Sequence, residues 1–301
     1  MNFLTLFCMA AVLASASSVM GAVVTQTATQ GANVSGWSAS GIWSDSATPS
    51  SGNTYINAAS MVIRTPEANN AVFAGDSLTI RGTLALKSSG STSRTKTADV
   101  ILDGGTISNY TDGNDRTQTL AGTMEVIATS TISAGGGGQN RNNQFSALVS
   151  GSAGINFTSA NAASANIFTN GSNSFSGSWN LQSGILRFTA GGATGTGLIS
   201  MSGGTLEIQD SWTGNALSLS GGSVALGDYG WSVQSLVIGT TSFTPGTYDI
   251  AALNGQGDVT FTGNTGTITV VPEASVAMSS VAGVLSLLLR RRRPGPGRTS
   301  S

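Results

Sequence analysis

The chain has 301 residues, of which only 9% are charged and 41 are glycine, and its formal net charge is −1. It has no histidine, and its one cysteine, Cys8, lies in the first apolar stretch. Histidine-based catalysis, disulfides and thiolate metal sites are therefore excluded for the rest of the chain, and we predict no metal and no cofactor. Residues 23–271 carry eight basic and thirteen acidic side chains, a net charge of −5 without a basic patch, which argues against nucleic acid as a partner.

The N-terminal segment is typical of a secretory signal peptide. Residues 3–13 are apolar, and small residues follow them. Ala14-Ser15-Ala16 and Val19-Met20-Gly21-Ala22 are two candidate cleavage sites with small residues at the required positions. The sequence therefore predicts that residues 1–22 are a signal peptide and that the protein is exported.

Residues 23–270 alternate apolar and polar side chains over short stretches and show no helical periodicity. Thr205-Leu206-Glu207-Ile208 is such a stretch, with one apolar face. Gly184, Gly204 and Gly222 open successive stretches at intervals of 20 and 18 residues, and glycine supplies the positive φ that a corner needs. One coil of this length cannot bury its apolar face alone, so successive coils must stack. The pattern predicts an all-β, coiled parallel structure.

Glycine-bounded motifs recur between residues 166 and 227. They are Asn173-Ser174-Phe175-Ser176-Gly177, Gly184-Ile185-Leu186, Gly195-Thr196-Gly197 and Gly203-Gly204-Thr205-Leu206. These motifs resemble the autotransporter-associated β-strand repeat. The resemblance implies a right-handed parallel β-helix (β-solenoid), here with short signal and anchor helices at the termini.

Segments outside the repeats have their own expected places in the body. We expect Trp37, Trp43 and Tyr55 to belong to an N-terminal cap, and Lys87–Lys96 and Gly135–Asn143 to be long polar loops. Near the end we expect a turn at Thr244–Asp249 and two final strands, Asp258–Phe261 and Thr267–Val270. Caps are needed because an open end of a parallel β-structure is a template for aggregation.

Side chains that could carry chemistry are few. Asp112 and Asp115 are three residues apart, but they match neither an EF-hand nor a calcium β-roll, and we interpret them as part of a polar turn. We interpret Glu207 and Asp210 as solvated carboxylates on a strand face and in a turn, rather than as an acid–base pair. Polysaccharide lyases with a β-helix use Asp, Lys and Arg, yet both lysines here fall in the segment predicted to be a mobile loop. We therefore predict no enzymatic activity and assign no catalytic residue.

Two further features of the body leave alternatives open. The tryptophans could stack against sugars, although they are more often part of a β core; they are Trp37, Trp43, Trp179, Trp212 and Trp231. Gly135-Gly136-Gly137-Gly138 is not a phosphate-binding loop, because no Gly-Lys-Ser/Thr follows it. Outward Thr and Ser residues make a polar surface that could bind glycans or ice, and Thr267-Ile268-Thr269 gives a single Thr-x-Thr step.

The C-terminal segment, residues 271–301, combines a short motif, an apolar run and a cationic end. The motif is residues 271–274, the apolar run is residues 274–289, and the basic cluster is residues 290–293. Sixteen residues span about 24 Å as a helix, somewhat less than the ~30 Å of a bilayer core. The arginines favour the cytoplasmic face, which would place the body outside.

This tripartite order resembles the PEP-CTERM sorting signal of bacteria, which the membrane protease exosortase is thought to process; the family has Pro where this chain has Ala274. The residues that match are Val271, Pro272, Glu273, Arg290, Arg291, Arg292 and Arg293. Together with looser likenesses at residues 71–78, 102–106 and 245–248, the chain resembles exported PEP-CTERM β-proteins of Verrucomicrobia-like bacteria. The resemblance implies an exosortase-type protease as a partner and transient anchoring in the inner membrane.

The sequence thus predicts a structural or adhesive protein of the cell surface or extracellular matrix. The alternative is a protein that binds or cleaves an extracellular polysaccharide, and an ice-binding surface ranks below both. The prediction depends on the export and sorting signals, on the repeats and on the shortage of catalytic side chains.

Overall fold

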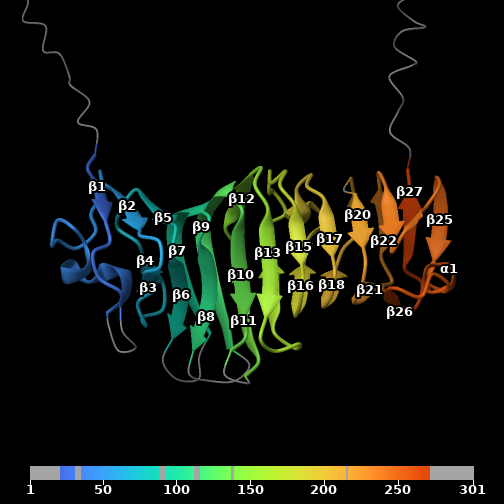
Figure 1. Ribbon diagram of the computed structural model, residues 1–301, viewed down its shortest axis with the longest axis horizontal. Coiled ribbons are helices and arrows are strands. Elements are labelled where there is room, and N and C mark those ends of the chain that lie inside the picture. Colours follow the sequence, from blue (N-terminus) through green and yellow to red (C-terminus); the bar gives the residue numbers. More distant parts are fainter. Residues whose placement is uncertain are drawn as a thin grey trace, which may run out of the picture.

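The computed structural model describes residues 21–30, 35–88, 93–111, 116–136, 139–214 and 216–271. The chain between these bounds winds into an elongated rod of stacked coils (Figure 1). The predicted parallel β-helix is confirmed. The helices expected in the signal peptide and in the anchor lie outside the described residues, apart from Gly21 and Ala22 at the end of the former.

Two long sheets run along the rod, and a smaller one joins them near the C-terminal end. The 13-stranded sheet contains β1 (Val23–Thr25), β2 (Thr54–Asn57), β4 (Ala71–Val72), β5 (Ser77–Ile80), β7 (Arg94–Asp103), β9 (Arg116–Ala128), β11 (Arg141–Phe145), β12 (Leu148–Gly151), β14 (Ala165–Phe168), β16 (Ile185–Phe188), β18 (Thr205–Ile208), β21 (Ser223–Gly227) and β26 (Thr260–Gly263).

The second long sheet has ten strands and alternates with the first along the chain. It contains β3 (Val62–Arg64), β6 (Thr83–Ser88), β8 (Thr106–Thr111), β10 (Ser130–Ala134), β13 (Ile155–Ser159), β15 (Trp179–Leu181), β17 (Ile199–Met201), β20 (Leu217–Leu219), β23 (Leu236–Ile238) and β24 (Thr241–Ser242). The small sheet contains β19 (Trp212–Thr213), β22 (Gly230–Val233), β25 (Gly246–Asp249) and β27 (Thr267–Val270).

Side-chain alternation fixes which residues fill the rod. On β18, Leu206 and Ile208 are buried, whereas Thr205 and Glu207 lie on the outer side. Parallel register places Leu206 beside Leu186 of β16 and Val224 of β21. Like residues therefore stack in ladders along the axis, which is the arrangement that the 20-residue spacing predicted.

Glycine corners permit the close spacing of the coils. Gly184 and Gly204 have φ of +78°, and Gly222 has φ of +92°, as the sequence predicted. A Cβ atom on Gly204 would lie 2.5 Å from the carbonyl oxygen of Gly184, and one on Gly222 would lie 2.5 Å from that of Gly204. Both the backbone conformation and the contact with the preceding coil therefore require glycine.

Aromatic rings fill the centre of the rod. Phe168 stacks on Phe145 at a centroid distance of 4.8 Å and on Phe188 at 5.6 Å. The ring of Trp179, from the opposite sheet, meets Phe168 edge-on at 4.8 Å. Each of these side chains is fully buried, so dispersion and the hydrophobic effect bind successive coils together.

The N-terminal end is closed by an aromatic cluster. The 3-10 helices η1 (Gly36–Ser38) and η2 (Ser40–Ile42) bring Trp37 and Trp43 against Phe73. Tyr55 meets both Trp43 and Phe73 edge-on, at 4.9 Å and 5.3 Å. These contacts agree with the capping role expected for this segment.

The C-terminal end is closed by antiparallel pairs and a short helix. β24 pairs antiparallel with β23 at the end of the ten-stranded sheet, and β25 pairs antiparallel with β27 at the end of the small sheet. The predicted turn at Thr244–Asp249 is wrong in part, because Gly246–Asp249 forms β25. A single helical turn, α1 (Ile250–Asn254), follows and corrects the prediction of a helix-free body; the Asp249 side chain caps it by accepting from the Ala252 amide at 2.8 Å. The final strand predicted at Thr267–Val270 is confirmed as β27, and the strand predicted at Asp258–Phe261 is found as β26, which begins two residues later.

Candidate functional site

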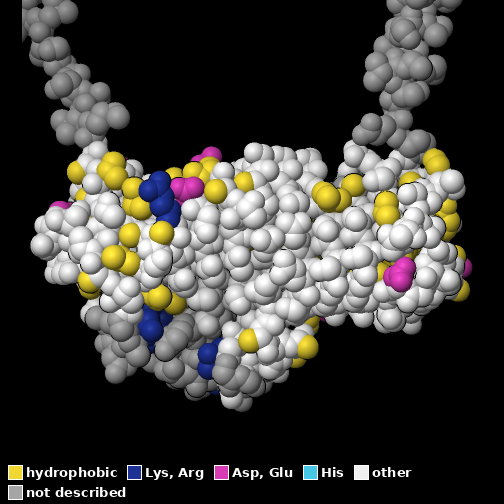
Figure 2. Space-filling view, in the orientation of Figure 1, with side chains coloured by type: hydrophobic (Ala, Val, Ile, Leu, Met, Phe, Trp, Pro, Cys, Tyr) yellow, Lys and Arg dark blue, Asp and Glu magenta, His cyan; other side chains and the backbone are white. Residues whose placement is uncertain are grey.

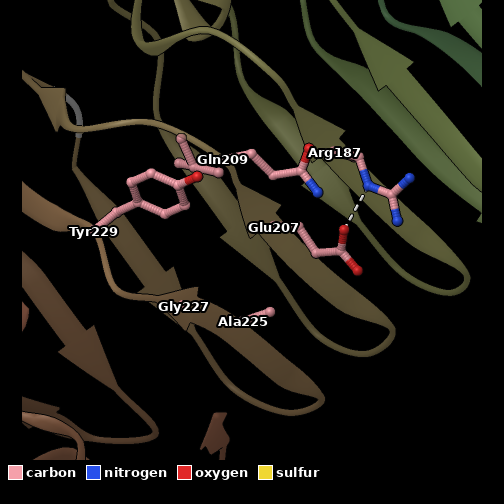
Figure 3. A pocket seen from close by; sticks show the side chains of 7 residues that line it. Arg187, Glu207, Gln209, Ala225, Gly227 and Tyr229 are labelled. Carbon is pink, nitrogen blue, oxygen red and sulfur yellow. Dashed lines mark hydrogen bonds and ion pairs between the residues drawn. The ribbon is translucent and has the colours of Figure 1, made fainter. Parts of the chain in front are cut away.

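An open groove crosses the outer face of the rod in its C-terminal half. Its cavity volume is about 410 Å³. The lining residues come from β16, β18 and β21 and from the segments that follow β18 and β21; they are Arg187, Glu207, Ile208, Gln209, Ala225, Gly227 and Tyr229. Figure 3 shows the ring of Tyr229 on the left and the Arg187–Glu207 pair on the right, with the side chain of Gln209 between them.

An ion pair forms one wall of this groove. Arg187 of β16 and Glu207 of β18 are register partners, and the Nε of Arg187 donates to the Oε2 of Glu207 at 2.5 Å (Figure 3). The expectation that Glu207 is a solvated carboxylate is therefore wrong. Parallel pairing places the two side chains next to each other on the outer face, where the sequence alone shows them 20 residues apart.

A β-bulge shapes the opposite wall. The register between β21 and β26 shifts between Ala225 and Gly227, and Gly227 has φ of +58°. The chain therefore bends away from the sheet, and Tyr229 is left 39% exposed. A tyrosine ring beside an amide and an ion pair offers both an apolar face and several hydrogen-bonding groups, which is the combination that sugars require.

The tryptophans are absent from this surface. All five are at most 1% exposed, so the interpretation as core residues is confirmed and the alternative of sugar-stacking platforms is wrong. The indole N–H of Trp179 donates to the carbonyl of Thr194 at 2.8 Å, and that of Trp212 donates to the hydroxyl of the same residue. Sequence reasoning missed Tyr229, because only the bulge after β21 brings it to the surface.

Both lysines of the body are buried strand residues, which corrects their expected place in a mobile loop; residues 89–92 of that predicted loop lie outside the described residues. Lys87 lies on β6 and is 3% exposed, and its Nζ lies 2.6 Å from the Oε1 of Glu67. Lys96 lies on β7 and is fully buried, and its Nζ donates to the carbonyl of Ala68. The strands reach further than the polar sequence suggested, because register pairing with β8 and β9 satisfies their backbones. The loop predicted at Gly135–Asn143 is wrong at its end only, since β11 begins at Arg141; residues 137 and 138 lie outside the described residues.

The ammonium group of Lys96 is in an unfavourable environment. The pKa of Lys96 is lowered from 10.5 to about 8, mainly because burial deprives the charged form of its hydration. The positive charge of Arg94 contributes to the lowering, and the negative charge of Glu67 partly offsets it. A lysine held in this way titrates near pH 8, well below an ordinary surface lysine.

The remaining predicted residues divide into those that the structure places and those outside it. Val271 is 46% exposed, and its amide donates to the carbonyl of Val233 at 2.8 Å. Asp210 accepts from the amide of Gly191 at 3.0 Å and is a turn residue, as interpreted. The residues that lie outside the described ones are Pro272, Glu273, Arg290, Arg291, Arg292, Arg293, Asp112 and Asp115.

Two features are absent from the described ranges. Among these residues, no group of three or more histidine, cysteine, aspartate or glutamate side chains is arranged to hold a metal ion. In the same part of the chain, no helix has the length and apolar character needed to cross a membrane. The predicted anchor, residues 274–289, lies outside the described residues.

Comparison with protein-family models, with curated proteins and with solved structures found no match.

Proposed function

We propose that this protein is an exported structural or adhesive component of the bacterial cell surface or extracellular matrix, without catalytic activity of its own. Export and sorting would use the signal peptide at residues 1–22 and the PEP-CTERM-like tail, with an exosortase-type protease as the processing partner and the inner membrane as a transient anchor. The body would then be displayed outside the cell.

One observation supports this proposal above the others. The rod is a continuous stack of parallel coils, with buried aromatic and aliphatic ladders inside and closed ends. Such a solenoid presents a long, regular outer face while each coil contacts only its neighbours. Its outer surface is mostly uncharged and polar, as Figure 2 shows for one face. These are properties of a spacer or an adhesive surface.

The tail is the part of the proposal that a localisation experiment tests. The full chain and a P272A/E273A variant would be expressed in a bacterium that has an exosortase, and cells would be fractionated. The unaltered protein should reach the surface, where added protease cleaves it in intact cells, whereas the variant should stay with the inner membrane. Recovery of both proteins in the cytoplasm would contradict export, and equal surface display would contradict sorting by this motif.

A second candidate function is binding of a neutral polysaccharide in the groove at Tyr229. The observation in its favour is the partly exposed ring opposite the Arg187–Glu207 pair, above a cavity of about 410 Å³. Sugar rings stack on aromatic faces, and their hydroxyl groups pair with amide and charged side chains.

Titration of neutral oligosaccharides by calorimetry tests this candidate. Y229A should weaken binding by roughly tenfold or more, since it removes the stacking face, while the matched variant Y229F keeps the ring and most of the affinity. Equal affinities of Y229A and the unaltered protein would contradict a binding site in the groove.

A further inference from the structure

The basic residues of the body gather at one corner of the rod. Six of the eight between residues 23 and 271 lie at the ends of β3 and β6 or at the starts of β7, β9 and β11; they are Arg64, Lys87, Arg94, Lys96, Arg116 and Arg141. The other two, Arg81 and Arg187, pair with Asp103 and Glu207 elsewhere. Because the six are spread over 78 residues of sequence, no basic patch was visible there, and parallel pairing assembles one. Figure 2 shows dark-blue side chains near the lower edge of the molecule, in the region where Figure 1 draws the ends of β6, β8 and β11.

Three arginines of this corner, Arg94, Arg116 and Arg141, lie at the starts of neighbouring strands. Arg116 of β9 and Arg141 of β11 are direct register partners, so their backbones are about 4.8 Å apart. Arg94 starts β7, where its register partner is Gln118, two residues beyond Arg116. Like charges placed side by side on neighbouring strands repel each other and destabilise the sheet. The fold therefore maintains this arrangement at an energetic cost.

The Nε atoms of these arginines have no acceptor among the described residues. The Nε atom of Arg94, of Arg116 and of Arg141 is buried and forms no hydrogen bond within the part of the chain that the structure describes. None of the three forms an ion pair with a described residue, and the carboxylate of Glu67 already lies 2.6 Å from the Nζ of Lys87. Asp112 and Asp115, which precede Arg116 in the chain, lie outside the described residues. The lowered pKa of the neighbouring Lys96, to which Arg94 contributes, is in keeping with this surplus of positive charge.

We propose that this basic corner, with Arg94, Arg116 and Arg141 in contact with ligand, binds the carboxylate groups of an acidic polysaccharide. A guanidinium group pairs with a carboxylate through two parallel hydrogen bonds, and three guanidinium groups at strand spacing match a polymer that carries a charge on each sugar. The rest of the body is acidic, with thirteen acidic residues in total, which disfavours a ligand of higher charge density such as DNA. The proposal concerns the body alone and does not depend on the route of export.

Calorimetric titration of the full chain with hexagalacturonate at low salt tests the proposal. Arg290–Arg293 of the tail contribute equally in every variant, so differences report on the corner. R116Q/R141Q should weaken binding by about tenfold or more, because charge-assisted hydrogen bonds are lost. The matched variant R81Q/R298Q removes the same charge outside both proposed binding sites and should stay within about twofold. The methyl-esterified hexamer should not bind, and raising the salt should weaken binding of the free acid.

Three results would overturn binding of an acidic polysaccharide at the basic corner. Equal losses in the two double variants would do so, since binding would then follow net charge. Duplex DNA binding as tightly as hexagalacturonate would overturn it in favour of a general polyanion surface. If inorganic phosphate displaced the hexamer at equal concentration, the corner would be a site for single oxyanions. That result would also overturn the proposal. Thermal unfolding checks the variants, and R94Q carries the same prediction should R116Q/R141Q fail to fold.

Discussion

The two halves of the rod fill the same interior positions with different chemistry. One inward ladder begins with a lysine on β7 and continues with apolar residues on the following coils; it is Lys96, Leu120, Phe145, Phe168, Phe188 and Ile208. The neighbouring ladder starts at the partly exposed Arg94, is polar as far as β14 and is apolar from β16 onward; its further members are Gln118, Asn143, Asn166, Leu186, Leu206 and Val224.

This difference shows that the geometry of a coil does not determine whether the side chains at these positions are polar or apolar. The backbone path is the same in both halves, so the strands do not require apolar partners at these positions. Polar side chains occupy them with part of their hydrogen bonding satisfied, as when the Nδ2 of Asn143 donates to the Oδ1 of Asn166 at 2.9 Å and to the carbonyl of Ser133 at 3.0 Å. The Oδ1 of Asn143 and the Nδ2 of Asn166 have no partner among the described residues. The C-terminal half is thus a uniform scaffold, and the N-terminal half adds polar groups that lead to the basic corner.

The largest effect is expected in the aromatic core of the rod. F168A removes a ring that contacts Phe145, Phe188 and Trp179 and should cost about 3–5 kcal/mol of unfolding free energy, because it leaves a cavity between rigid coils. Chemical denaturation measures it. A loss below about 1 kcal/mol would mean that the coils do not depend on this stack.

A smaller effect is expected at the glycine corners. G204A combines a positive φ with a contact of 2.5 Å to the carbonyl of Gly184 and should cost about 2–4 kcal/mol. Gly104 has nearly the same φ, +79°, but a Cβ there meets no atom within 4 Å, so G104A should cost only about 1–2 kcal/mol. Equal losses of unfolding free energy would show that coil contact contributes nothing at this corner.

In the polar ladder, a single Asn→Leu substitution should lower stability, and a second one at its partner should restore part of the loss. N143L leaves the Oδ1 of Asn166 and the carbonyl of Ser133 without their donor and should cost about 1–3 kcal/mol. N143L/N166L extends the apolar ladder by two coils and should restore part of that loss. A double variant less stable than the sum of the single variants in denaturant would contradict the view that the ladder tolerates either chemistry.

The smallest effect concerns the charge of Lys96. Its pKa in the folded protein, about 8, lies below the ordinary 10.5, so between these values the unfolded chain binds more protons and stability should rise with pH. K96M should abolish this rise and be about 1 kcal/mol more stable at pH 7. Urea unfolding at pH 7 and pH 9.5 measures both. K87M keeps Lys96, so its stability should still rise with pH. If the stability of K96M also rises with pH, other groups cause the rise.

Much of the fold could be predicted from local patterns. Alternation of apolar and polar residues identified the strands, and the spacing of Gly184, Gly204 and Gly222 gave the length of a coil. Both signals depend only on neighbours in sequence and on the φ preference of glycine. The final strands were found for the same reason, whereas α1 was missed because five residues are too few to show a helical period.

The groove and the basic corner could not be predicted in this way, because both are made by register. Arg187 and Glu207 become neighbours only through pairing of β16 with β18, and Arg116 and Arg141 only through pairing of β9 with β11. Lys96 was misread because a polar stretch next to Ser and Gly residues resembles a loop. Nothing local shows that a strand begins at Arg94.

The intact mass of the protein recovered from its native envelope tests the central claim, a rod that is exported and then sorted. We predict a chain that begins near residue 23 and ends near Glu273, without the apolar run and the arginines. A mass that includes Met1 and Arg290–Arg293, found in the cytoplasmic fraction, would contradict both export and sorting.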